Sequence, residues 1–93
     1  MAKAETKTVY DGQTYEIGEE IWDLGSLRCV EVHGKQRYYQ GHTQDKLKLP
    51  KYDDLATGSR AILIDPTGEE STIIARYDES TKQWLNLKGG VVA

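Results

Sequence analysis

Short runs of alternating apolar and polar residues follow one another along most of the chain, and turn-forming residues separate them. The clearest runs occupy the last third, at residues 60–65, 71–77 and 82–88, with Asp-Pro-Thr-Gly and Asp-Glu-Ser-Thr-Lys between them. Runs of this length, rich in Ile, Leu, Tyr and Trp and bounded by turn residues, are typical of strands joined by tight hairpins. The pattern therefore predicts a C-terminal three-stranded meander. In its middle strand Ile73, Ala75 and Tyr77 form the more apolar set, so we expect that side to meet the core.

The N-terminal half predicts two more hairpins. Residues 8–10 and 14–17 flank Asp11-Gly12, a pair that readily adopts the positive φ angles of a two-residue turn. Residues 27–33 and 36–41 flank a bend at Gly34-Lys35. Together with the meander this gives about six to seven short strands, which predicts an all-β fold, a small antiparallel barrel or sandwich.

The linking segment at residues 42–58 is the least regular part of the chain. Residues 52–58 suit a single helical turn that ends at Gly58, so at most one short helical turn is expected. A chain of 93 residues makes one domain. We expect that β domain to span residues 8–88, between a flexible N-terminal arm at 1–7 and a flexible C-terminal tail at 89–93.

The charge pattern bears on partners. The net charge is −3, and acidic and basic residues are interspersed, which makes nucleic acid an unlikely main partner. The local exception is Lys46, Lys48 and Lys51, which we interpret as a solvated loop because Asp45 and Asp53 flank it. No apolar run reaches the length of a membrane helix and the N-terminus has no signal-peptide core, so synthesis in the cytoplasm without secretion is expected.

No pattern of reactive residues predicts catalysis. Cys29 is the sole cysteine and lies in an alternating run, where a small buried side chain is expected. His33 and His42 have no third ligand at a recognisable spacing, and Ser59 lacks the glycine context of a nucleophile elbow. We therefore predict no catalytic residue, no metal, no cofactor and no enzymatic activity.

Aromatic and apolar side chains supply the candidate contact residues instead. Tyr and Trp are the residues most often found at the centre of protein interfaces. The predicted interface residues are Tyr38, Tyr39, Trp22, Trp84, Val91 and Val92. Tyr38 and Tyr39 are adjacent on one predicted strand and must face opposite sides. For Trp84, a place in the core is the competing interpretation.

Four segments resemble small virion proteins encoded in the structural gene clusters of tailed bacteriophages and prophages. They are Gln36-Arg-Tyr-Tyr-Gln-Gly41, Lys48-Leu-Pro50, Thr57-Gly-Ser-Arg-Ala-Ile-Leu-Ile-Asp65 and Ala75-Arg-Tyr-Asp-Glu-Ser-Thr-Lys-Gln-Trp84. The resemblance spans residues 36–84 and implies a non-enzymatic structural protein of the virion, either a capsid decoration or head-associated protein or a tail component. It further implies docking on the major capsid or tail protein of the same phage, and self-association into a homo-oligomer in the assembly.

A second hypothesis comes from the residues themselves. Small size, the aromatic strand residues Tyr38, Tyr39 and Trp84, and the lysine loop at 46–51 are also compatible with a cytoplasmic β-barrel adaptor. Such an adaptor would bind a peptide or a single-stranded nucleic acid on one strand face.

Overall fold

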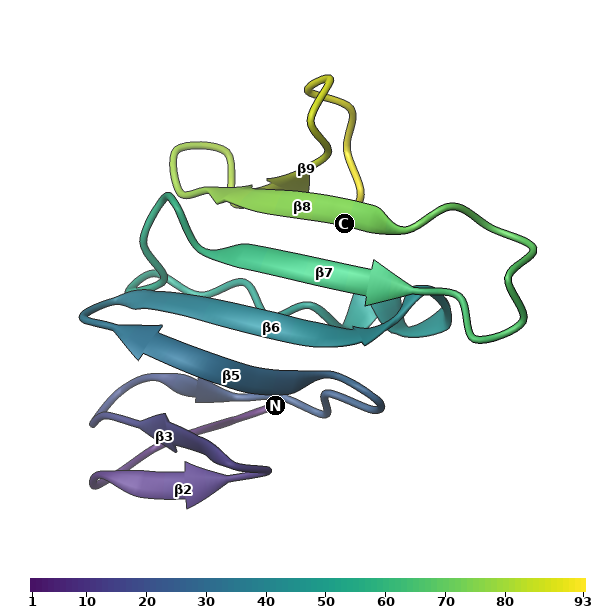
Figure 1. The fold of residues 1–93 in the computed structure, drawn as a ribbon. Coiled ribbons are helices and arrows are strands. Elements are labelled where there is room, and N and C mark those ends of the chain that lie inside the picture. The colour runs from purple at the N-terminus through teal and green to yellow at the C-terminus, as the bar shows by residue number, and fades with distance from the viewer.

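A computed structural model describes residues 1–93, and its regular secondary structure is almost entirely β-strand (Figure 1). Two small antiparallel pairs precede one five-stranded sheet. The small pairs are β1 (Ala2–Lys3) with β4 (Glu20–Ile21), and β2 (Thr8–Tyr10) with β3 (Gln13–Tyr15). The large sheet runs in the order β5 (Arg28–His33), β6 (Gln36–His42), β7 (Arg60–Ile64), β8 (Ile73–Asp78) and β9 (Gln83–Leu85). The predicted all-β class and the C-terminal meander β7–β8–β9 are confirmed.

Both predicted N-terminal hairpins form where the turn residues place them. Asp11 and Gly12 adopt φ angles of 51° and 81° between β2 and β3, which is the backbone that a two-residue turn requires. Gly34 adopts a φ of 60° between β5 and β6. The sheet is open, with β5 and β9 at its two edges.

One pairing departs from a purely antiparallel arrangement. Strands β6 and β7 run parallel, with Tyr38 opposite Arg60 and His42 opposite Ile64. A parallel pair needs a crossover, and the chain makes it with the irregular segment at 43–59. Figure 1 shows this segment passing behind the sheet.

The single helical element lies in that crossover, but not where the sequence predicts it. A short 3-10 helix, η1 (Thr43–Lys48), follows β6 directly, whereas residues 52–58 form turns without a helix. The prediction of a helical turn at 52–58 is therefore wrong. Asp45 holds η1 in place, since its carboxylate accepts the Ser26 N–H at 2.9 Å. Hydrogen bonds from Ser26 lower the pKa of Asp45.

The core lies between one face of the sheet and the crossover segment. Trp84 is its centre, fully buried, with its ring edge-on to Tyr39 and tilted against Tyr77. Its indole N–H donates to the Pro50 carbonyl at 2.9 Å, which fastens the crossover to the sheet. Ala75 and Tyr77 are buried and Ile73 packs against them, so the predicted inward side of the middle strand is confirmed.

Both chain ends contact the rest of the fold. In the N-terminal arm Ala4 is buried and its N–H donates to the Glu19 carbonyl at 2.7 Å. At the other end the Trp84 N–H donates to the Ala93 carbonyl at 2.9 Å, and Ala93 is buried. Both ends add backbone hydrogen bonds to the fold, because each lies beside a strand that has a free edge. No helix in the structure has both the length and the apolar character needed to cross a membrane.

Candidate functional site

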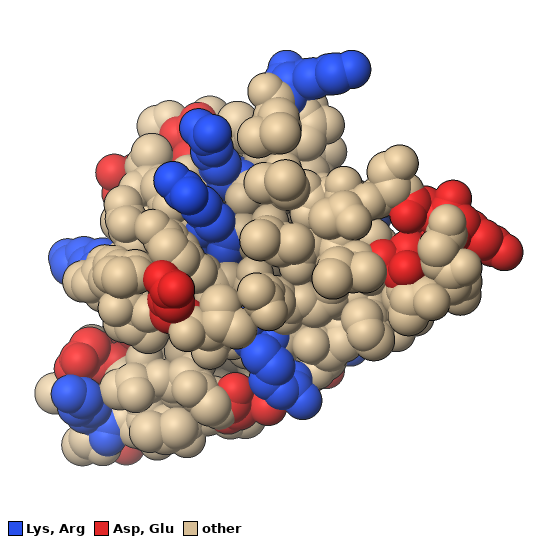
Figure 2. Space-filling model, viewed as in Figure 1, with Lys and Arg blue, Asp and Glu red and all other residues tan.

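The side of the large sheet opposite the core is uncovered. We call it the outer face; it comprises the outward side chains of β5 to β9 and is the side seen in Figures 1 and 2. Strand register places one side chain from each strand in a single row across it. The row is Glu31, Tyr38, Arg60, Arg76 and Leu85. The next row is Arg28, Gln40, Ile62 and Ile74.

Arginine is concentrated on this face. The chain has four arginines: Arg28, Arg60 and Arg76 lie on the outer face, and Arg37 is buried. No lysine belongs to any strand of the five-stranded sheet. Figure 2 shows cationic side chains over the sheet, while acidic atoms gather on the loop that follows β7. Arginine forms bidentate bonds with carboxylates and stacks on aromatic rings, so this distribution favours an interaction surface.

Two of these arginines stand directly opposite each other. Arg60 on β7 pairs in register with Arg76 on β8, and neither forms an ion pair within the chain. Like charges opposite each other in a sheet are destabilising. The Arg60 guanidinium also lies 5.6 Å from the centre of the Tyr38 ring, an arrangement typical of a cation–π contact. Arg28 differs, because it pairs with Asp11 at 2.9 Å.

Exposed apolar side chains complete the outer face. Ile62, Ile64 and Ile74 are 40%, 53% and 43% exposed, and Leu85 is half-buried beside them. Isolated exposed apolar residues are ordinary on protein surfaces, but neighbouring ones on the same face of a sheet form a patch. The combination of apolar, aromatic and arginine side chains is the composition of protein interfaces.

The predicted interface residues fall in several different places. Tyr38 lies on the outer face, whereas Tyr39 and Trp84 are buried in the core and are not accessible to a partner. Trp22 is half-buried and packs against the core, as does Val92, while Val91 is exposed. Sequence reasoning missed Arg60 and its pairing with Arg76. The alternation in residues 60–64 and 73–77 carries that signal, but the register of the hairpin is needed to bring the two arginines together.

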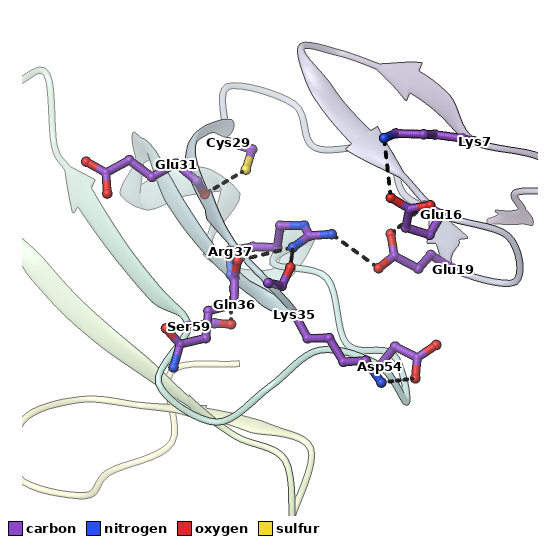
Figure 3. A network of polar contacts seen from close by, with 11 residues as sticks. Lys7, Glu16, Glu19, Cys29, Glu31, Lys35, Gln36, Arg37, Asp54 and Ser59 are labelled. Atoms are coloured by element: carbon purple, nitrogen blue, oxygen red, sulfur yellow. Dashed lines mark hydrogen bonds and ion pairs between the residues drawn. The ribbon is translucent and has the colours of Figure 1, made fainter.

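A second polar region lies between the β2–β3 hairpin and the large sheet, around a hollow of about 340 Å³. Figure 3 shows the polar contacts of this region. Three ion pairs line it: Lys7–Glu16 at 3.7 Å, Lys35–Asp54 at 3.4 Å and Arg37–Glu19 at 3.2 Å. Each cation already has a carboxylate partner, so the hollow has no free charge to offer a ligand. Of the three pairs, Arg37–Glu19 joins the segment that follows the β2–β3 hairpin to strand β6 of the large sheet.

Ser59, Cys29 and His33, three further candidate reactive residues, are each buried or engaged in contacts within the chain. Ser59 is buried, accepts the Arg37 N–H and donates to the Ala56 carbonyl, which leaves its hydroxyl no role as a nucleophile. Burial raises the pKa of the Cys29 thiol, so it is protonated at neutral pH. His33 contacts Glu31 at 2.7 Å, and no group of three His, Cys, Asp or Glu side chains is placed to hold a metal ion.

No protein-family model matches this chain, and comparison with curated proteins and with solved structures found no match.

Proposed function

We propose that this protein is a non-enzymatic docking protein that binds an acidic surface of a partner protein through the outer face of its five-stranded sheet. The observation that carries the proposal is the unpaired, directly opposed pair Arg60 and Arg76 beside Tyr38. Opposed like charges cost stability in the free protein. A partner carboxylate placed between them would relieve that repulsion and form charge-assisted hydrogen bonds with both guanidinium groups.

The resemblance over residues 36–84 supplies the class of partner. It supports a place in the virion of a tailed phage, where the protein docks on the major capsid or tail protein and neighbouring copies contact one another. An uncovered sheet face that carries exposed isoleucines and arginines suits binding to a repeated protein lattice.

Quantitative mass spectrometry on density-banded phage particles from the source host tests this proposal. We expect peptides of this chain in clean particles, and a loss of occupancy of about tenfold or more in particles that carry Arg60→Ala/Arg76→Ala. The control Lys35→Ala/Lys82→Ala also removes two exposed positive charges, but from turns at the ends of the sheet, and should leave occupancy unchanged. Absence of the chain from clean particles would reject the virion assignment.

The outer face also motivates an alternative, because arginines beside an exposed tyrosine occur where single-stranded nucleic acids bind. Two observations disfavour nucleic-acid binding. Arg60 and Arg76 are the only unpaired cations on this face, and the whole chain is negatively charged. Fluorescence anisotropy with short poly(dT) and poly(U) probes separates the two functions. Binding that falls steeply with added salt and disappears in the Arg60→Ala/Arg76→Ala variant would favour the nucleic-acid alternative.

A further inference from the structure

A groove beside the start of β8 is separate from the outer-face arginines. It has a volume of about 550 Å³ and is formed where the first residues of β8 approach the C-terminal tail. Its apolar lining consists of Ile73, Ile74, Leu87, Val91 and Val92. Leu87 and Val91 are 66% and 61% exposed, so the groove has an apolar wall open to solvent. Lys46 and Lys88 also line it.

The backbone of β8 has an unused edge at this groove. Strand β9 pairs only with Arg76, Tyr77 and Asp78, and so leaves the first half of β8 without a neighbour on that side. The Tyr77 N–H donates to the Ser59 carbonyl, so the backbone polar groups of Tyr77 point toward β7. Because these groups alternate in direction along a strand, the N–H and C=O of Ile74 point the opposite way, into the unpaired edge.

The other free edges of the sheet are protected. The C-terminal tail covers the outer edge of β9, where the Val92 N–H donates to the Trp84 carbonyl at 2.7 Å. Strand β5 has a bulge between Cys29 and Glu31, and it carries charged side chains. Bulges and charges are the usual means of preventing strand addition. The β8 segment at 73–75 has neither, which leaves it able to accept a further strand.

The charge at the groove indicates what it accepts. Lys46 and Lys88 form no ion pair within the chain, and no carboxylate lines the groove. A second copy of β8 would bring its own two lysines to the same place, and the like charges would repel. We propose that this groove binds an extended acidic segment of a partner protein, which adds a strand to β8 at Ile74 and places its carboxylates near Lys46 and Lys88. Alternate side chains of that segment would contact Leu87 and Val91.

Nuclear magnetic resonance titration with a synthetic peptide tests the proposal. The probe alternates Val with Thr and has Glu at both ends. We expect saturable shifts of the amide signals of Ile74, Leu87 and Val91, and slower hydrogen exchange of the Ile74 amide by about tenfold or more in the saturated complex. A matched peptide with Pro in place of its central Val cannot complete the ladder and should bind at least about tenfold more weakly.

Two protein variants separate this groove from the outer face. Lys46→Glu/Lys88→Glu reverses the charge of the groove and should weaken the probe by about tenfold, since each exposed pair contributes a modest amount. Arg60→Gln/Arg76→Gln removes the outer-face charges without adding negative ones and should weaken the probe by no more than about twofold, so failure of the outer-face proposal does not affect this one. No saturable binding up to about 1 mM probe, or equal binding of the Pro-containing peptide, would overturn the inference.

Discussion

The buried ion pair between Glu19 and Arg37 gives the sharpest test of how the N-terminal hairpin is held to the sheet. The two side chains are only 4% and 3% exposed, and their charged atoms lie 3.2 Å apart. The second carboxylate oxygen of Glu19 accepts the Glu16 N–H at 3.0 Å, and Arg37 also donates to the Gly34 carbonyl. Replacing Glu19 by Gln keeps the shape of the side chain but leaves the Arg37 charge buried without a counterion.

The expected cost is a large part of the total stability. Removing one partner of a buried ion pair costs about 3–5 kcal/mol, and Gln retains one acceptor for Arg37, so we expect the low end, about 3 kcal/mol. A chain of this size is stable by only about 5–14 kcal/mol. The neighbouring pair Lys7–Glu16 provides the matched control, since its side chains are 69% and 59% exposed. Glu16→Gln should therefore cost about 0–1 kcal/mol.

Urea denaturation followed by tryptophan fluorescence measures both variants. With an m value of about 1.5 kcal/mol per M, Glu19→Gln should lower the midpoint by about 2 M, and Glu16→Gln by well under 1 M. Glu19→Leu/Arg37→Met removes both charges together and should recover part of the loss. Equal urea midpoints for Glu19→Gln and Glu16→Gln would refute the inference that the buried Glu19–Arg37 pair stabilises the packing of the N-terminal segment on the sheet.

Further predictions concern packing and pH. A Cβ atom at Gly41 would lie 2.9 Å from the Leu27 Cα, so Gly41→Ala should destabilise the fold by about 1–3 kcal/mol, measured by the same urea titration; an unchanged midpoint would contradict the close approach of the two backbones. Burial raises the pKa of Tyr15 to about 12 and raises the pKa of Tyr39 well above its usual value. The unfolded tyrosines lose their protons near pH 10, so this contribution to stability is complete below pH 10 and is lost as pH rises from about 10 to 12. The urea midpoint should therefore fall over that range, and Tyr15→Phe should make the fall shallower; an identical fall in Tyr15→Phe would remove Tyr15 from the explanation.

Local signals in the sequence were sufficient for the strands and hairpins. Asp11-Gly12 and Gly34 fix turns through their own backbone preferences, and alternation in residues 73–77 identifies the buried side of β8. The parallel pairing of β6 with β7 could not be found in this way, because it depends on how the crossover packs against Trp84. The same packing places the 3-10 helix at 43–48, where Asp45 can reach the Ser26 N–H.

The candidate site was less accessible to sequence reasoning than the fold. Residue type identifies tyrosines as candidate contact residues, but it does not distinguish Tyr38 on the outer face from Tyr39 in the core. Alternation shows only that the two face opposite sides. Arg60 and Arg76 are sixteen positions apart in the sequence, and only the register of β7 against β8 makes them neighbours. The placement of Arg60 opposite Arg76 therefore follows from the strand register and not from the sequence alone.

The parallel pairing of β6 with β7 has a consequence for folding kinetics. The hairpin β5–β6 and the meander β7–β8–β9 each consist of strands that are close in the sequence, so each can form early and alone. Pairing β6 with β7 requires closure of the loop at residues 43–59. The conformational entropy of that loop is lost before the β6–β7 hydrogen bonds form and compensate for it. Pairing of β6 with β7 is therefore expected to limit the rate of folding. Until these strands pair, the matching edges of β6 and β7 are both exposed, so partly folded chains are most vulnerable to association through these two strands.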